Sequence, residues 1–339
     1  MMSSNVYGID LGTNNLKVFC KASGKILNEK NTVAIVNKNQ LYAYGDAAYA
    51  MYEKAPDTIQ VSFPVVGGVI AEYNFLQTMI FEFLEKHSKG KVRGADFIVA
   101  VPTDITEVEK KAFFDMFYKS RVKPRLVQVC EKPIADAVGL GLDVNEPTGV
   151  MLVDIGADTT EISVISLGGL VLSSLLHFGG NQLDDSIISY VRKNNNLLIG
   201  RKTACALKES IGCALPGSEE TMMIVGRDVV SGLPIETEVT AQQVHEAIQA
   251  DLGDICNSIK MTLEHTPPEL ARDIIHAGIY ITGGSSRIRQ LDQLFAQTTN
   301  MQVNTCEDPE ECVARGLVKI VSDSKFKHLA YTLKAKIYK

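Results

Sequence analysis

Two stretches of the chain combine an aspartate, a glycine two residues later and a short polar turn. They are DLGTNN, which starts at Asp10, and DIGADT, which starts at Asp154. Backbone N–H groups in such turns can donate to phosphate oxygens, and the two aspartates can hold the water molecules of a Mg²⁺ ion. A single turn of this kind is usually only a turn, whereas two in one chain suggest a polyphosphate site.

The apolar residues around these turns indicate the elements that hold them. In 7–20 and 151–166 an apolar strand precedes each turn and alternating apolar residues follow it, which predicts two β-hairpins. The chain therefore contains one motif twice. A third segment, IYITGG at 279–284, is a predicted buried strand that leads into two glycines and a helical pattern at 288–297. That order directs N–H groups and a positive helix end at an anion.

The remaining pattern is that of a layered α/β protein. Apolar residues 75, 76, 79, 80, 83 and 84 predict one face of a helix, and 95–102 predicts a buried strand. Thr106 with Glu109 predicts a capping box at the start of the next helix. No Gly-x-x-x-x-Gly-Lys-Ser/Thr is present and no Gly-x-Gly-x-x-Gly follows a strand, which argues against P-loop and Rossmann proteins.

Bulk composition limits the function classes. The chain has 339 residues and 45% hydrophobic content, which is more than one core usually contains, so we expect at least two lobes. The formal net charge of -6 gives no general attraction for nucleic acid. Seven cysteines without a Cys-x-x-Cys pair indicate free thiols in the cytoplasm. We expect neither a secreted nor a membrane-spanning protein, since no apolar run reaches about 18 residues.

Several separated motifs together resemble the MreB family of bacterial actins, the rod shape-determining proteins, from residue 5 to about 320. They include GIDLGTNN, EPTGVMLVDIGADTTEISVISLGG, TPPELARDI and GIYITGGSSRIRQLDQL, in the family's order. The resemblance implies the actin/Hsp70/sugar-kinase (ribonuclease H-like) fold, with two duplicated lobes around a cleft for ATP or ADP and Mg²⁺. It places the first lobe at 1–140, with a small subdomain at about 29–71 and a C-terminal completion at about 315–339. The second lobe is 141–314, with a small subdomain at about 181–245.

The resemblance also assigns the residues of the nucleotide site. The first phosphate loop is Asp10, Gly12, Thr13, Asn14 and Asn15, with Lys17 reaching the phosphates. The second loop is Asp154, Gly156, Ala157, Asp158 and Thr159. Cys205 and Lys208 are expected near the base and ribose, and the adenosine motif is Gly283, Gly284, Ser285 and Ser286. Asp10 and Asp154 would hold Mg²⁺ through water.

Two departures from the family pattern concern the chemistry. Ala157 and Asp158 replace glycines of the second loop, and Lys132 replaces the glutamate expected to orient the attacking water. A carboxylate about 4 Å from a phosphate oxygen costs on the order of 4 kcal/mol at an effective dielectric constant of about 20. Charged Lys132 cannot accept a proton from water. With Lys132 and Thr159 as the catalytic positions, we therefore expect hydrolysis to be slow or absent.

These departures suggest a hypothesis about charge. Lys132 and Asp158 would form an exchanged charge pair, with Lys17 adding positive charge, so that nucleotide binds but is not readily hydrolysed. The alternative is that Asp158 points to solvent and that binding is ordinary.

The last segment, 324–339, carries five lysines and no acidic residue. At helical spacing Phe326, Leu329, Leu333 and Ile337 form an apolar stripe with Ala330, which suits a helix lying on a membrane surface. Two alternatives are a docking face onto the first lobe and a solvated tail. The basic stretch 86–96 is a second candidate for contact with anionic headgroups, or a solvated turn.

The function that these features favour is that of a nucleotide-binding bacterial actin. By resemblance it would polymerise into protofilaments at the inner face of the cell membrane, for cell shape, wall synthesis or motility. Its partners would be copies of itself, the membrane surface and paralogous bacterial actins, without nucleic acid. The alternatives are a regulatory actin-like protein that does not polymerise and a small-molecule kinase of the same fold.

Overall fold

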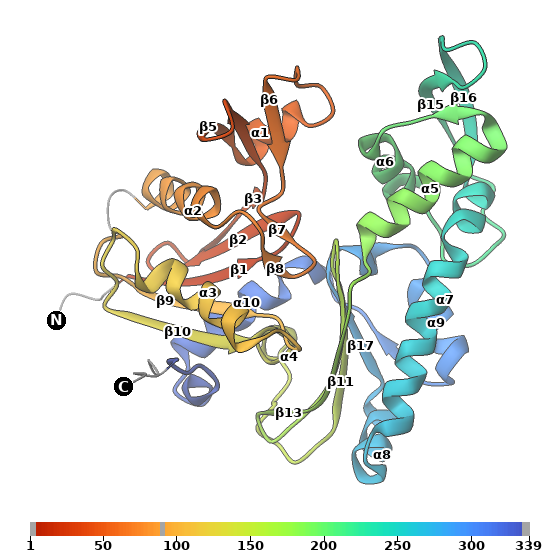
Figure 1. Ribbon diagram of the computed structural model, residues 1–339. Helices are drawn as coiled ribbons and strands as arrows, with labels where there is room; N and C mark the ends of the chain where they lie inside the picture. The colour runs from red at the N-terminus through yellow and green to blue at the C-terminus, as the bar shows by residue number, and fades with distance from the viewer. Residues whose placement is uncertain (1–4, 89–91, 334–339) are drawn as a thin grey trace. The chain divides into compact units, whose positions relative to one another are not determined.

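The computed structural model describes residues 5–88 and 92–333, and Figure 1 shows their course. Two compact units divide the chain. Unit 1 comprises Met1–Glu146, Ser166–Leu170 and Glu310–Lys339, and unit 2 comprises Pro147–Ile165 and Val171–Pro309. Each unit combines helices with a five-stranded sheet, so the predicted α/β class is confirmed. Within the described ranges, no helix has the length and apolar character needed to cross a membrane.

Unit 1 contains a five-stranded, a three-stranded and a two-stranded sheet. Its strands are β1 (Val6–Leu11), β2 (Asn15–Cys20), β3 (Lys25–Lys30), β4 (Val33–Val36), β5 (Gln40–Tyr44), β6 (Ile59–Ser62), β7 (Val65–Val66), β8 (Val69–Ile70), β9 (Asp96–Val101) and β10 (Leu126–Glu131). Its helices are α1 (Gly45–Met51), α2 (Tyr73–His87), α3 (Glu107–Tyr118), α4 (Lys132–Leu140), α10 (Cys312–Ser322) and the 3₁₀ helix η3 (Lys327–Leu329).

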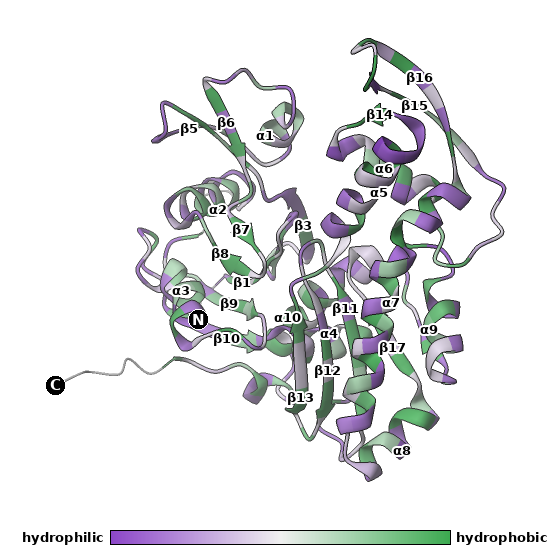
Figure 2. Cartoon of the chain, turned by 45° about the vertical axis from the view of Figure 1, so that its right-hand side comes forward, coloured by the Kyte–Doolittle hydropathy of each residue, from purple (hydrophilic) through white to green (hydrophobic). Residues whose placement is uncertain are grey.

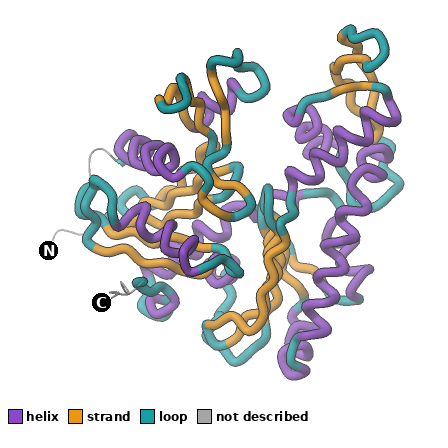
Figure 3. The backbone as a smooth tube through the Cα atoms, in the orientation of Figure 1, coloured by secondary structure: helices purple, strands orange, loops and turns teal. Residues whose placement is uncertain are grey.

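Unit 2 contains a five-stranded and a three-stranded sheet, drawn with their helices in Figure 3. Its strands are β11 (Val150–Ile155), β12 (Thr160–Ser166), β13 (Gly169–Leu176), β14 (Leu197–Leu198), β15 (Thr221–Asp228), β16 (Pro234–Thr240), β17 (Ile279–Thr282) and β18 (Val303–Asn304). Its helices are α5 (Gly180–Asn195), α6 (Arg201–Ile211), α7 (Ala241–His265), α8 (Pro268–Ala277), α9 (Leu291–Thr299) and the 3₁₀ helix η1 (Gly284–Arg287), and the 3₁₀ helix η2 (Pro309–Glu311) lies at the boundary.

The two five-stranded sheets share one topology. The strand order is β10-β9-β1-β2-β3 in unit 1 and β18-β17-β11-β12-β13 in unit 2. In both, the central strand pairs antiparallel with its hairpin partner and parallel with a strand from later in the chain. The repeated motif predicted from the sequence is therefore two copies of one sheet, each with its hairpin turn at the same place.

Residues of β1 show which helices cover each face of the sheet in unit 1. Successive side chains of a strand point to opposite faces. Tyr7 and Ile9 belong to the core that also contains Phe81 of α2 and Phe117 of α3. A Cβ atom on Gly8 would lie 2.9 Å from Cβ of Leu317 in α10. Helices α2 and α3 therefore cover one face and α10 covers the other, which fixes the strand that carries Asp10.

Three local predictions for unit 1 are confirmed. The predicted apolar face is buried in α2, including Leu76, Met79 and Ile80. Every residue of β9 is buried, and Figure 2 shows hydrophobic colour along this strand. The capping box of α3 is present, because Thr106 Oγ1 accepts from the backbone N–H of Glu109 at 3.2 Å and Glu109 accepts from the N–H of Thr106 at 2.7 Å.

The helix predicted at 288–297 begins later, at Leu291. Arg289 forms an isolated parallel bridge with Cys213, and its carbonyl accepts from the N–H of Ala214 at 2.8 Å. Gln290 then takes a left-handed conformation with φ +60. Pairing with a segment far away in the sequence therefore overrides the helical pattern over the first three residues.

The prediction of a helix over 324–339 is wrong for the described part of that segment. Only Lys327–Leu329 forms a short 3₁₀ helix, and Tyr331 then forms an antiparallel bridge with Val129 of β10. The physical reason is that β10 is an edge strand whose backbone groups are open to pairing. Leu329 is buried in unit 1, so it cannot belong to a free apolar stripe, while Ile337 lies outside the described residues.

Candidate functional site

The hairpin of β1 and β2 holds the first predicted loop. The N–H of Gly12 donates to the carbonyl of Asn15 at 3.1 Å and closes the turn. Asp10 and Lys17 face each other in the strand register, and Lys17 Nζ lies 3.4 Å from Asp10 Oδ2. Both residues are buried, at 4% and 8% exposure. The predicted lysine is therefore a partner of the loop's aspartate, and a bound phosphate would have to compete for it.

The hairpin of β11 and β12 repeats this turn. The N–H of Gly156 donates to the carbonyl of Thr159 at 2.8 Å. A Cβ atom on Gly156 would lie 3.0 Å from that carbonyl oxygen, the same distance as for Gly12 and Asn15 in the first turn. Ala157 and Asp158 thus leave the turn of the second loop unchanged, because neither replaces the residue that needs to be glycine.

The two turns differ in the charge opposite the aspartate. Glu161 stands opposite Asp154, at the position that Lys17 occupies opposite Asp10. Asp154 and Glu161 are buried, with 4% and 3% exposure. Asp154, Asp158 and Glu161 therefore give the second turn three acidic residues, where the first turn has Asp10 opposite a lysine. In the described ranges no cluster of three or more such ligands is arranged to hold a metal ion directly.

Asp158 is held by a residue that the sequence patterns did not reveal. Asn181 Nδ2 donates to Asp158 Oδ1 at 2.6 Å. The backbone of the same segment is also fastened to the loop, since the N–H groups of Gly180 and Asn181 donate to the carbonyls of Gly156 and Ala157 at 3.0 and 2.7 Å. Gly180 and Asn181 are the first residues of α5. The carboxylate therefore lies at the positive end of a helix, which stabilises negative charge.

The predicted adenosine motif packs onto the second loop within unit 2. Gly283 has φ +81, and a Cβ atom there would lie 2.3 Å from Asp154 Oδ1. Ser285 Oγ donates to the carbonyl of Gly156 at 2.9 Å. Gly284 begins η1, and Ser286 Oγ donates to the carbonyl of Gly283 at 2.7 Å. The structure thus brings the second loop and the glycine pair together.

Lys208 of α6 contacts the first turns of α5. Its Nζ donates to the carbonyl of Gly180 at 2.6 Å and lies 2.7 Å from Asp184 Oδ1. Burial raises the pKa of Asp184, and the charge of Lys208 opposes that rise. Cys205 donates to Glu209 Oε1 at 3.4 Å, and burial raises the pKa of its thiol to about 12, so it stays protonated. Lys208 therefore joins α5 and α6 beside the loop.

The two positions predicted to be catalytic, Lys132 and Thr159, belong to different units. Lys132 is the first residue of α4 in unit 1, directly after Glu131 at the end of β10. Glu131 accepts a hydrogen bond from Tyr331 Oη at 2.5 Å and lies 3.5 Å from Lys110 Nζ. Thr159 closes the second turn in unit 2. The predicted charge pair of Lys132 with Asp158 would need residues of both units and stays a prediction.

Two sheets of one topology, each with an aspartate before a glycine-closed hairpin turn, define the actin class of fold. The family model for the MreB/Mbl protein matches residues 4–328. The chain therefore belongs to the MreB/Mbl family.

Relatives agree in sequence over most of their length. Cell shape-determining protein MreB of Escherichia coli (strain K12) is 39% identical over 323 residues, covering 93% of this chain and 92% of that protein. Cell shape-determining protein Mbl of Bacillus subtilis (strain 168) is 38% identical over 312 residues, covering 91% and 93%.

Solved structures agree in fold. MreB5 of Spiroplasma citri bound to AMPPNP superposes with a TM-score of 0.91 at 32% identity, over 97% of this chain and 99% of that one. The MamK double helical filament gives a TM-score of 0.79 over 94% of this chain and 99% of that one, and its 24% identity speaks for the fold alone.

Proposed function

We propose that the protein binds an adenine nucleotide with Mg²⁺ and assembles with copies of itself into filaments at the cytoplasmic face of the cell membrane. In this proposal it hydrolyses ATP slowly or not at all. The observation that carries nucleotide binding is the pair of hairpin turns, closed by Gly12 N–H to Asn15 and by Gly156 N–H to Thr159. MreB5 of Spiroplasma citri, at 32% identity, has been solved with AMPPNP and with ADP.

The contacts of Asp158 support binding in spite of its charge. A charged hydrogen bond from Asn181 and the N-terminus of α5 hold the carboxylate in place. Because the carboxylate of Asp158 lies at the N-terminus of α5 and accepts from Asn181, its repulsion of a phosphate is reduced. Mg²⁺ between the carboxylates and the phosphates would reduce it further.

Slow hydrolysis rests on Lys132. An ammonium group at the position of a water-orienting glutamate cannot accept a proton, and losing such a group commonly costs a factor of about 10² or more. Lys17 cannot take over the role of the missing glutamate, because Lys17 is also a cation and its Nζ lies 3.4 Å from Asp10 Oδ2. ATP bound in the filament would therefore stay unhydrolysed until it dissociates.

Association with the membrane would rest on exposed lysines of the C-terminal segment. Lys325 and Lys327 are exposed in the C-terminal segment, but Lys325 is paired with Asp143. Flotation with vesicles that contain about a third anionic lipid, with K327E as the variant, tests this point. We expect the variant to bind several-fold more weakly, at about 1 kcal/mol per lost cation. Equal flotation of both proteins would remove this segment from the proposal.

The main test combines titration with sedimentation. Isothermal titration with AMPPNP and Mg²⁺ should give heat, and the protein should pellet at raised concentration when that nucleotide is present. Heat without pelleting would favour the regulatory alternative, in which the fold is kept and polymerisation is lost. No heat with any adenine nucleotide would contradict the proposal itself.

A further inference from the structure

Residues at the end of β3 are fastened to the first loop by three hydrogen bonds. Asn31 Nδ2 donates to the carbonyl of Gly12 at 2.7 Å, and the N–H of Asn31 donates to the carbonyl of Asn14 at 2.9 Å. Asn15 Nδ2 donates to Asn28 Oδ1 at 2.8 Å. Two of these bonds come from Asn31 alone. Asn31 thus ties the loop to the chain segment that follows β3.

Asn31 is fully buried, with 0% exposure, and of its two side-chain polar atoms Nδ2 has a hydrogen-bond partner while Oδ1 has none among the described residues. The neighbouring Thr32 is also fully buried, and its Oγ1 is in the same condition. Leaving a buried polar atom without a partner costs free energy, so such atoms in a native fold call for a physical reason. A second arrangement of the loop, in which a donor reaches Asn31, would supply one.

The place of Asn31 in the chain gives that arrangement a consequence. Asn31 and Thr32 connect β3 of the five-stranded sheet to β4 of the three-stranded sheet. The carbonyl of Thr32 accepts from the N–H of Gly45 at the start of α1 at 2.8 Å, and Glu29 accepts from the N–H of Asp46 at 2.7 Å. The three-stranded sheet of β4, β5 and β6, called the small sheet below, and α1 are therefore joined to the first loop through residues 29–32.

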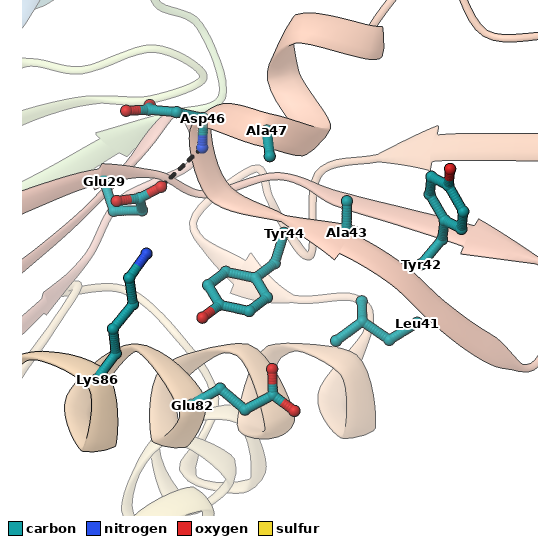
Figure 4. Close-up of a pocket in the computed structure, with 9 residues that line it drawn as sticks. All are labelled: Glu29, Leu41, Tyr42, Ala43, Tyr44, Asp46, Ala47, Glu82 and Lys86. Carbon is teal, nitrogen blue, oxygen red and sulfur yellow. Dashed lines mark hydrogen bonds between the residues drawn. The ribbon is translucent and has the colours of Figure 1, made fainter.

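A pocket that Glu29 helps to line leaves room for the small sheet to move. It has a volume of 530 Å³ and is lined by residues of β3, β5, α1 and α2. Figure 4 shows Glu29 and Tyr44 on its upper side and Glu82 with Lys86 on α2 below. Burial, Glu82 and Glu29 all raise the pKa of Tyr44, in agreement with two carboxylates near one hydroxyl group. The small sheet thus faces α2 across an open space while it is fixed at Asn31.

We propose that Asn31 is a positioning residue that couples the first phosphate loop to the three-stranded sheet of unit 1. A nucleoside di- or triphosphate with Mg²⁺ changes the hydrogen bonding of the loop, the change passes through the carbonyls of Gly12 and Asn14 to Asn31, and the sheet shifts over the pocket. By linkage, the sheet in turn sets the affinity of the loop for the nucleotide. This inference rests on the proposed binding of nucleotide.

Hydrogen exchange with mass spectrometry tests the coupling in the full chain. The probes are ADP with Mg²⁺ and AMPPNP with Mg²⁺, and the readouts are peptides that cover 10–17 and 33–62. In the native protein nucleotide should slow exchange in both segments, by about fivefold or more if the coupling lies in the usual range. N31S removes the side-chain bond to Gly12 and keeps the backbone bond to Asn14, so it should keep the response in 10–17 and weaken the response in 33–62. N31D, which has the same size but no donor for Gly12, should behave in the same way.

N28S is the matched control, because it removes the contact between Asn15 and Asn28 and leaves both Asn31 bonds in place. It should respond as the native protein does. A native protein with a protected loop and an unchanged small sheet would overturn the coupling, as would N31S with an undiminished response in 33–62. If nucleotide leaves exchange in 10–17 unchanged in the native protein, the proposed nucleotide binding fails as well. If both Asn31 variants fail to fold, the exchange of segments 10–17 and 33–62 in the native protein, with and without nucleotide, tests the coupling.

Discussion

Asn181 Nδ2 donates to Asp158 Oδ1 at 2.6 Å, and this bond places the carboxylate at the first turn of α5. From the sequence, either Lys132 pairs with Asp158 or Asp158 points to solvent. The structure supplies an amide and a helix N-terminus from its own unit. A negative charge at that position is stabilised by about 0.3–1 kcal/mol, with more from a charged hydrogen bond. Asp158 therefore has stabilising contacts within its own unit, and its pairing with Lys132 stays a prediction.

Removing the charge of Asp158 should strengthen nucleotide binding. An unscreened carboxylate near a phosphate would cost on the order of 4 kcal/mol, and we expect Asn181 and α5 to offset part of it. D158G should therefore bind AMPPNP with Mg²⁺ roughly tenfold to a hundredfold more tightly in isothermal titration, with a smaller gain for ADP. E236Q, an exposed carboxylate of β16, is the control for a lost charge and should leave affinity unchanged. Equal affinity of D158G and the native protein would show that Asp158 does not face the phosphates.

Replacing Lys208 should destabilise unit 2. Lys208 is the charged partner of buried Asp184, and K208M leaves that carboxylate without it, at a cost of about 3–5 kcal/mol. Urea denaturation at neutral pH measures the loss. K193M, an exposed lysine of α5, should cost no more than about 0.5 kcal/mol. A similar loss in both variants would mean that the pair contributes little to stability.

The loss in K208M should depend on pH with a definite sign. Burial already raises the pKa of Asp184 above its ordinary value of 3.8, and removing Lys208 raises it further. A carboxyl group whose folded pKa is raised contributes stability that is present below its unfolded pKa and is lost as pH rises through the folded pKa. The difference between K208M and the native protein should therefore be smaller at about pH 4.5 than at about pH 7.5. A difference that stays constant across this range would contradict the assignment to Asp184.

Tyr331 should make the protein sensitive to alkali. Burial and the bond to Glu131 raise the pKa of its hydroxyl above the ordinary value of 10.0. This contribution to stability is therefore present below about pH 10 and is lost as pH rises toward the folded value. Y331F should cost about 1 kcal/mol at neutral pH and should show a shallower decline above about pH 10, followed by thermal unfolding. Y42F, which changes an exposed tyrosine, is the control and should match the native profile. If the stability of Y331F declines above about pH 10 as steeply as that of the native protein, the bond between Tyr331 and Glu131 does not make this contribution.

Features set by neighbouring residues could be predicted from the sequence. The hairpins at Asp10 and Asp154, the capping box at Thr106 and the buried strand β9 all follow from patterns of residues that are close together in the sequence. The resemblance to a family, carried by motifs spread along the chain, gave the fold class that the solved structures bear out.

Features set by distant pairing could not be predicted. Asn181 lies 23 residues from Asp158, and Asn31 lies 19 residues from Gly12, so no local pattern links either pair. The paired glycines before Asn181 were the one available signal. The helical stripe at 324–339 misled for the same reason, because the open edge of β10 captured Tyr331. Sequence periodicity records which residues are apolar, and tertiary contacts decide what covers them.

The most direct test of the central claim is the fate of ATP bound to the native protein with Mg²⁺. Protein in excess over ATP is incubated, denatured and assayed for ATP, ADP and phosphate, beside the variants K132E and K132E with D158G. The account predicts that the native protein returns its nucleotide as ATP, while K132E with D158G releases phosphate faster by a factor of about 10² or more. Phosphate release from the native protein at the rate of the double variant would contradict it.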